Sequence, residues 1–181
     1  MWRRPNSRPR PLTTTRKEDA HVGRQRSRRA SAPAVWGDHR YDLVPIEVDG
    51  VLHGVNNDLE FVGQCMTSDG AISAIQLTSA GVMDLGTLGG SASSARGINA
   101  DGAIVGGALT RGDVSHHAFL HEDGVMYDLN ALISPDVEYE LVHALGINDR
   151  GDIVAIGHHD GTDRVVLLRR RQPGRAGSVE R

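Results

Sequence analysis

A Gly-Val/Ile-Asn triplet that occurs three times constrains the fold of this chain more than any other feature. The copies begin at Gly54, Gly97 and Gly146, which are 43 and 49 residues apart. Six residues after each Asn lies the centre of a short apolar run, at Val62, Val105 and Val154. Periods of about 20 to 50 residues are typical of solenoids, propellers and other repeat arrays. The sequence therefore predicts tandem repeats with a period of about 43 residues.

A second motif follows the same period. Met83-Asp84-Leu85 recurs as Tyr127-Asp128-Leu129, and Tyr41-Asp42-Leu43 is an earlier copy. We therefore expect one repeat domain over residues 35–170, made of about three units at 41–86, 87–130 and 131–170.

The turn after each triplet has its own chemistry. In the turns that start at Asn99 and Asn148, the Asn side chain can bond the backbone ahead of it, and Gly102 or Gly151 supplies a left-handed residue. The first copy, Asn56-Asn57-Asp58-Leu59, has Leu where this Gly is expected. We predict a tighter turn there, with Asn57 and Asp58 at positive φ.

Each unit is thus predicted to hold four short strands, which is the size of a propeller blade. The expected fold is all-β: four-stranded repeats of about 43 residues in a partial or open β-propeller-like array. The longer second spacing is assigned to an insertion over residues 130–142, where Pro135 disfavours a long helix. The layers between units are expected to contain the apolar residues Val55, Phe61, Val62, Ile75, Leu77, Leu85, Ile98, Ile104, Val105, Phe119, Leu120, Met126, Leu129, Ile147, Ile153, Val154 and Leu167.

These motifs resemble a known family. Residues 84–90 (Asp-Leu-Gly-Thr-Leu-Gly-Gly), 97–102, the triplet His117-Ala118-Phe119 and Asp128-Leu129-Asn130 are similar to the HAF repeat family of extracellular bacterial proteins. The similarity covers roughly residues 41 to 170, but the first and third units have Ser73-Ala74-Ile75 and Arg164-Val165-Val166 in place of the triplet. The resemblance implies a β-propeller-like array and an extracellular location, and it implies no catalytic residue or ligand.

The repeat signature assigns structural roles to thirteen residues. They are the turn, glycine and apolar positions that recur or define the motifs: Asn56, Asp84, Leu85, Gly97, Asn99, Gly102, His117, Ala118, Phe119, Asp128, Leu129, Asn148 and Gly151.

Nine histidines raise the question of a metal site, because His116, His117 and His121 lie close together in the sequence. On a strand, His117 and His121 share one face and His116 takes the other. At about 3.3 Å per residue, His117 and His121 are about 13 Å apart, too far to share one zinc ion. We assign no metal ligand, and a metal-binding or enzymatic loop face near His116–His121 is kept as an alternative.

Other chemistry is also disfavoured. The glycine-rich residues 86–91 lack the Gly-Lys-Ser/Thr of a phosphate-binding loop, and Ser91, Ser93 and Ser94 do not form a Gly-x-Ser-x-Gly elbow. Cys65 is the single cysteine, so it can form no internal disulfide. We predict no enzymatic activity and no cofactor.

The charges are unevenly distributed. Residues 1–30 hold ten basic side chains against two acidic ones, whereas the rest of the chain holds ten against twenty-one. Residues 1–34 and 171–181 contain too little apolar surface to offset the entropy of ordering and are predicted to be disordered. Nucleic-acid or anionic-surface binding through the Arg-rich tail is a further alternative, although the acidic body would repel the same partner.

The sequence also addresses location and partners. No apolar run reaches the ~18 to 20 residues of a membrane span, and the basic start is not followed by the apolar segment of a signal peptide. Three units would leave exposed edge strands, which are association sites. The sequence therefore predicts a non-catalytic binding or surface scaffold that self-associates through its open edges.

Overall fold

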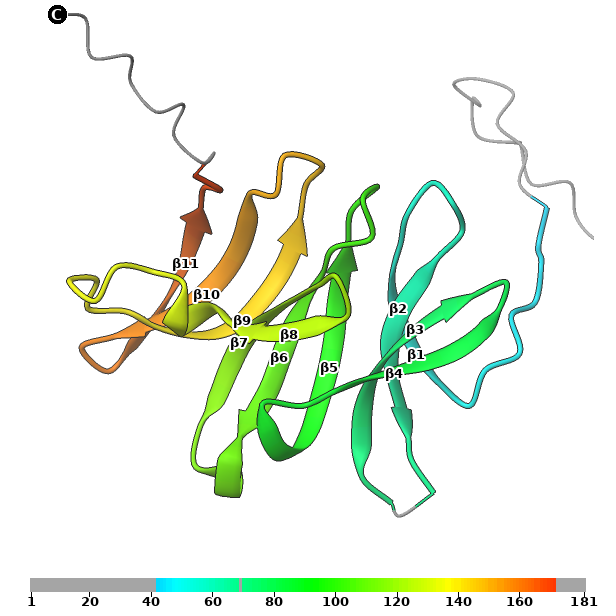
Figure 1. Cartoon of the computed structure of the whole chain (residues 1–181), viewed down its shortest axis with the longest axis horizontal. Helices are drawn as coiled ribbons and strands as arrows, with labels where there is room; N and C mark the ends of the chain where they lie inside the picture. Colours follow the sequence, from blue (N-terminus) through cyan, green and yellow to red (C-terminus); the bar gives the residue numbers. More distant parts are fainter. Residues whose placement is uncertain (1–41, 69, 172–181) are drawn as a thin grey trace, which may run out of the picture. The chain divides into compact units, whose positions relative to one another are not determined.

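The computed structural model describes residues 42–68 and 70–171 (Figure 1). The chain divides after Val44, and every strand of the described residues lies in the second part, residues 45–181. The predicted disordered segment 1–34, which includes the proposed nucleic-acid-binding tail, lies outside the described residues, as does the predicted disordered segment 171–181 except for Arg171.

The first repeat is a four-stranded antiparallel meander. Each strand pairs with the next along the chain, and the four strands are β1 (Gly50–Val55), β2 (Phe61–Met66), β3 (Ile72–Thr78) and β4 (Gly81–Gly86).

The second repeat has the same connectivity. Its strands are β5 (Gly89–Ile98), β6 (Ile104–Thr110), β7 (His116–Glu122) and β8 (Val125–Asp128), with a short 3-10 turn, η1 (Arg111–Asp113), between β6 and β7. One parallel pair, Ile72 with Ala92, joins β3 to β5, so the two meanders form a single mixed sheet of eight strands.

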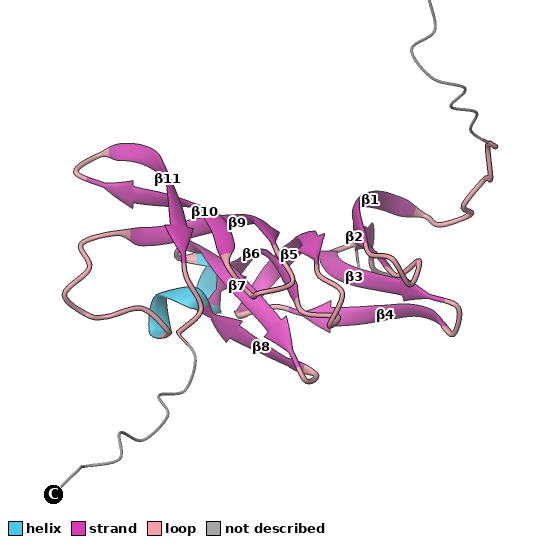
Figure 2. Ribbon diagram, turned by 90° about the horizontal axis from the view of Figure 1, so that it is seen from above, coloured by secondary structure: helices cyan, strands magenta, loops and turns pink. Residues whose placement is uncertain are grey.

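The third repeat forms a separate sheet of three strands. It follows a second 3-10 turn, η2 (Leu129–Ala131), and contains β9 (Glu140–Ile147), β10 (Ile153–His159) and β11 (Thr162–Leu168). Pro135 lies in the irregular segment that separates η2 from β9, and Figure 2 shows how little helix there is. The predicted fourth strand of this repeat is not found among the described residues.

The all-β class is confirmed, and within residues 42–68 and 70–171 the strands form no closed barrel or propeller. In the same part of the chain, no helix combines the length and the apolar character that a bilayer crossing needs.

The sequence-based prediction for the first turn was wrong. Leu59 itself adopts a positive φ of 58°, and neither Asn57 nor Asp58 does. The Asn56 side-chain oxygen accepts the amides of Asp58 at 3.1 Å and Glu60 at 3.0 Å, which keeps the same turn shape as in the other repeats. Leu59 therefore takes the left-handed conformation that Gly102 and Gly151 take elsewhere, both at a φ of 79°.

Two apolar clusters lie between successive repeats. The first joins Val62 and Leu85 of the first repeat to residues of the second, among them Ile104 and Phe119. The second joins Val105 of the second repeat to residues of the third, among them Leu141, Ala144 and Ile153. Because neighbouring residues of a strand point to opposite faces, Ile104 and Val105 place β6 in both clusters.

Three residues assigned to these layers are in fact exposed. Val55 is 53%, Val154 39% and Leu167 55% exposed. Val55 belongs to the first repeat, and Val154 and Leu167 belong to the last, where no neighbouring repeat covers that side among the described residues. The repeat pattern identified their strand positions but not the absence of a covering layer.

Candidate functional site

The Asn of each triplet organises its own turn. Asn99 Oδ1 accepts the amide of Ala103 at 2.8 Å. In the third repeat, Asn148 Oδ1 accepts the amides of Arg150 and Asp152, both at 2.9 Å. These bonds satisfy backbone donors that a strand ladder cannot reach at a turn.

The same Asn side chains connect the repeats. Asn56 Nδ2 donates to the backbone oxygen of Asn99 at 3.2 Å, and Asn99 Nδ2 donates to the backbone oxygen of Asn148, also at 3.2 Å. Asn148, in the last described repeat, instead donates its amide to Asp152 Oδ2 at 3.2 Å. The result is a ladder in which each triplet binds the equivalent residue of the next repeat.

The Gly of the triplet allows this close approach. A Cβ built at Gly54 would lie 3.1 Å from the Arg96 oxygen, and one at Gly97 would lie 3.0 Å from the Gly146 Cα. At Gly146 itself, a Cβ would meet no heavy atom of the described residues within 4 Å. Glycine therefore allows a tight backbone approach at Gly54 and Gly97, where two repeats meet, whereas Gly146 in the last described repeat has no such neighbour among the described residues.

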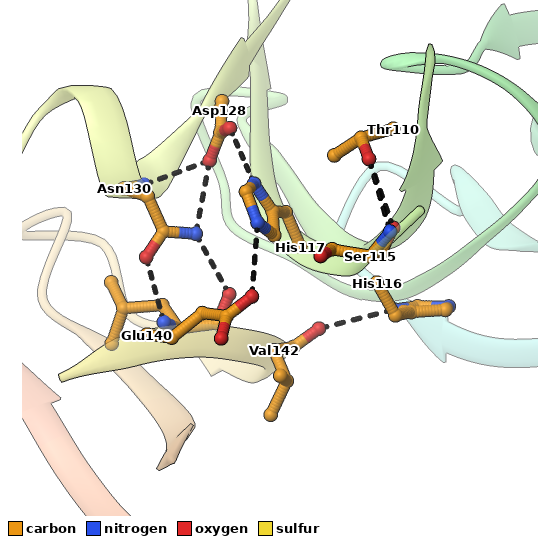
Figure 3. A network of polar contacts seen from close by, with 9 residues as sticks. Thr110, Ser115, His116, His117, Asp128, Asn130, Glu140 and Val142 are labelled. Atoms are coloured by element: carbon orange, nitrogen blue, oxygen red, sulfur yellow. Dashed lines mark hydrogen bonds and ion pairs between the residues drawn. The ribbon is translucent and has the colours of Figure 1, made fainter. Parts of the chain in front are cut away.

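His117 lies in a polar network between the second and third repeats (Figure 3). Its Nδ1 donates to Asp128 Oδ2 at 2.6 Å, and its Nε2 lies 3.2 Å from Glu140 Oε1. Asn130 extends the network, because its side chain accepts the Leu141 amide at 2.7 Å and donates to the Leu141 oxygen at 3.0 Å. The network thus links β7 and β8 of one repeat to β9 of the next.

The Asp of the Asp-Leu motif has a related role in the first repeat. Asp84 Oδ1 accepts the Ser73 hydroxyl and the Gly86 amide, as Asp128 accepts His117 and the Asn130 amide. Ser73 therefore takes the place of His in the repeat that lacks the His-Ala-Phe triplet. The sequence identified both motifs but not that one binds the other.

The remaining histidines of this region do not join His117. His116 donates to the Val142 oxygen at 3.2 Å, and its ring lies 4.3 Å from that of His143. Burial lowers the pKa of His143, and the nearby His116 and Arg96 lower it further. His121 is 8% exposed, and burial lowers its pKa as well.

Within residues 42–68 and 70–171, no group of three His, Cys, Asp or Glu side chains is placed to hold a metal ion. The signature residues Ala118, Phe119, Leu85 and Leu129 are buried core residues rather than surface groups.

The glycine-rich stretch, residues 86–91, joins the end of β4 to the start of β5 and is held by side-chain hydrogen bonds. The Ser91 amide and hydroxyl both donate to the Asp113 carboxylate, at 2.7 and 2.8 Å. Ser93 donates its hydroxyl to the Gly86 oxygen at 2.6 Å and accepts the Ala74 amide at 2.8 Å. The Asp113 carboxylate thus occupies the Ser91 amide, which is then not free to bind a phosphate. The Ser93 hydroxyl is engaged in two hydrogen bonds that hold the chain together.

Comparison with family models, curated proteins and solved structures finds no match for this chain. The polar residues described above are therefore interpreted from their geometry. Glu140 and Asn130, to which the sequence assigned no role, belong to the same network as His117. Only Asn130, within Asp128-Leu129-Asn130, lay inside a recognised motif.

Proposed function

We propose that this chain is a non-catalytic, HAF-type repeat scaffold, a binding or surface protein whose units form a partial β-propeller-like array. One observation carries the proposal: the signature side chains use their polar groups to join one repeat to the next. Asn56 and Asn99 do so through the ladder, and His117, which also bonds Asp128 of its own repeat, does so through Glu140.

The arrangement of the units supports a propeller-like array over other repeat forms. The first two repeats are four-stranded meanders, and the third begins with three strands of the same order. In each junction, apolar side chains of one repeat face those of the next. Stacked four-stranded units of this size are the blades of propellers.

Substitution of His117 distinguishes a structural scaffold from a metal-dependent protein. His117→Ala removes the partly buried hydrogen bond between His117 and the Asp128 carboxylate. We therefore expect the free energy of unfolding of the full chain to fall by about 1–2 kcal/mol. His158→Ala is the matched control, because His158 also pairs with a carboxylate, Asp163, but the two side chains are 45% and 68% exposed. Its effect should stay below about 0.5 kcal/mol.

The same proteins should be measured by urea unfolding with and without added zinc. A scaffold shows the same stability in both conditions. A zinc-dependent increase in wild-type stability that His117→Ala abolishes would favour the metal alternative and contradict the proposal.

A further inference from the structure

Among the described residues, the face that each repeat turns toward the next is covered in the first two repeats and open in the third. Val62 and Val105 are 0% exposed, but Val154, at the same place in β10, is 39% exposed. On the neighbouring strand, Ala118 is 0% exposed, whereas its equivalent Val165 is 73% exposed. We call this side of the third repeat, with Gly146, Val154, Val165 and Leu167, the back face.

The opposite face is open in the first repeat. Val55 is 53% exposed, whereas its equivalent Ile98 is 9% exposed and belongs to the first apolar cluster. Val82 is 54% exposed, whereas its equivalent Met126 packs against the same cluster. We call this side of the first repeat, with Val55, Phe61 and Val82, the front face.

We propose that two copies of this chain associate head to tail, with the back face of one third repeat on the front face of the other copy's first repeat. The proposal rests on the scaffold function given above. Its physical basis is the interface already present twice within the chain, where a back face meets a front face of the same repeat type. The two open faces are the third pair of this kind.

Polar groups also match across the proposed contact. Within the chain, the Asn99 and Asn148 backbone oxygens each accept an Asn amide from the preceding repeat. Between copies, Asn148 is the corresponding donor, and the Asn56 backbone oxygen, which accepts the Leu59 amide at 3.3 Å, is the corresponding acceptor. Asn148 lines a hollow of about 1220 Å³ with Gly146, Val154 and Leu167, where the triplet strand of the second copy would lie.

Head-to-tail association also accounts for a missing strand. Among the described residues β11 pairs with β10 on one side only. Its other edge corresponds to the edges by which β3 and β7 pair with β4 and β8, and it has no partner among those residues. The fourth-strand motif occurs once more in the sequence, at residues 41–43, ahead of β1. By the repeat period this motif belongs to a unit that would precede the first repeat, and in the assembly the third repeat of the other copy takes that place.

Two copies provide six repeats, within the range of about 4 to 8 blades of closed propellers. A head-to-tail contact uses two different faces, so it either closes into a ring or continues as a filament. We infer a closed ring of two chains, because this is the smallest closed assembly that leaves neither face open.

The test is the mass of the full chain in solution, measured by light scattering during size exclusion over a range of concentrations. Wild type should have twice the chain mass. Val55→Asp and Val154→Asp each place a charge in the contact. Each substitution should raise the dissociation constant of the dimer by at least about 10-fold, so each variant should behave as a monomer. Val114→Asp is the control, because Val114 is 82% exposed in a loop on neither face, and it should remain a dimer.

Mixing the two variants tests the direction of the contact. Val55→Asp retains an intact back face and Val154→Asp an intact front face, so an equimolar mixture should recover a mass of two chains through one contact. A dimer of Val55→Asp alone would show back-to-back pairing and overturn the proposal, as would a mixture that stays monomeric.

A wild type that is monomeric at every concentration would also overturn the association. It would leave the scaffold function standing, because that function is judged separately by the unfolding of His117→Ala. Circular dichroism of both Asp variants should match wild type, since both sites are on the surface of the single chain.

Discussion

At Leu59 the chain adopts a backbone conformation that its side chain disfavours. The φ of 58° is in the left-handed region, which costs a residue with a Cβ about 1–2 kcal/mol. Leu59 is 69% exposed, so its side chain contributes little packing in return. The Asn56 side chain holds this turn, which explains why the repeat tolerates Leu where the other units have Gly.

Replacing this residue should therefore stabilise the protein. We expect Leu59→Gly to raise the free energy of unfolding by about 0.5–1 kcal/mol, the relief of strain less the entropy that glycine adds to the unfolded chain. Leu59→Ala retains a Cβ at positive φ and should give no gain. Urea unfolding of both variants checks this, and a less stable Leu59→Gly would contradict it.

The buried His121 and the half-buried His143 make the stability of the protein depend on pH. The pKa values of His143 and His121 are lowered below the usual 6.5 by burial, so the unfolded state binds protons that the folded state does not. Their contribution to stability is complete above about pH 6.5 and is lost as the pH falls through the folded-state pKa.

We therefore expect the free energy of unfolding to decrease from about pH 7.5 to about pH 5, with a smaller decrease in His143→Gln than in wild type. Denaturation in urea at several pH values measures the slope. An identical slope in the two proteins would remove His143 from this explanation.

At the scale of the elements, the Asn turns differ in what they connect. Asn99 is 4% exposed and bonds both its own turn and the third repeat. Asn148 also bonds the backbone of its own turn. Its side-chain amide donates to Asp152 in that turn and not to another repeat, and the residue is exposed.

Asn99→Ala should lower the free energy of unfolding by about 2–3 kcal/mol, because it leaves the buried Ala103 amide without its side-chain acceptor and removes the bond to the third repeat. Asn148→Ala should cost about 1 kcal/mol, since water can replace the lost bonds. Equal losses, measured by urea unfolding under one set of conditions, would argue against the ladder as a connection between repeats.

The elements themselves were largely predictable from the sequence. Strand positions and turns followed from local chemistry, as in Asn99-Ala100-Asp101-Gly102, and the apolar positions at Ile104 and Val105 are buried as expected. The conformation of Leu59 was not predictable, because the bonds that hold it come from Asn56 and override the preference of Leu itself. The partners of His117 were missed because Glu140 follows an insertion of irregular length.

At the scale of the whole molecule, burial depends on neighbours that a repeat pattern does not count. Val105 and Val154 have equivalent places in the sequence, yet one is 0% and the other 39% exposed. The difference arises because a third repeat follows Val105, whereas no repeat follows Val154 among the described residues. The sequence could therefore predict which residues face a neighbouring repeat, but not how many such faces remain open.

Successive repeats stack through backbone contact at the Gly-Val/Ile-Asn triplets. Gly97 and Gly146 test this stacking as a matched pair, because the same methyl group is added at equivalent positions. A Cβ at Gly97 would lie 3.0 Å from the Gly146 Cα, whereas one at Gly146 would meet no described heavy atom within 4 Å.

The decisive measurement is the difference in free energy of unfolding between Gly97→Ala and Gly146→Ala, taken on dilute protein so that association plays no part. Gly97→Ala should be destabilised by about 1–3 kcal/mol, as expected for overpacking against backbone. Gly146→Ala should stay within about 0.5 kcal/mol of wild type, as at an open surface position. Equal effects of the two substitutions would contradict the stacking of repeats at these glycines.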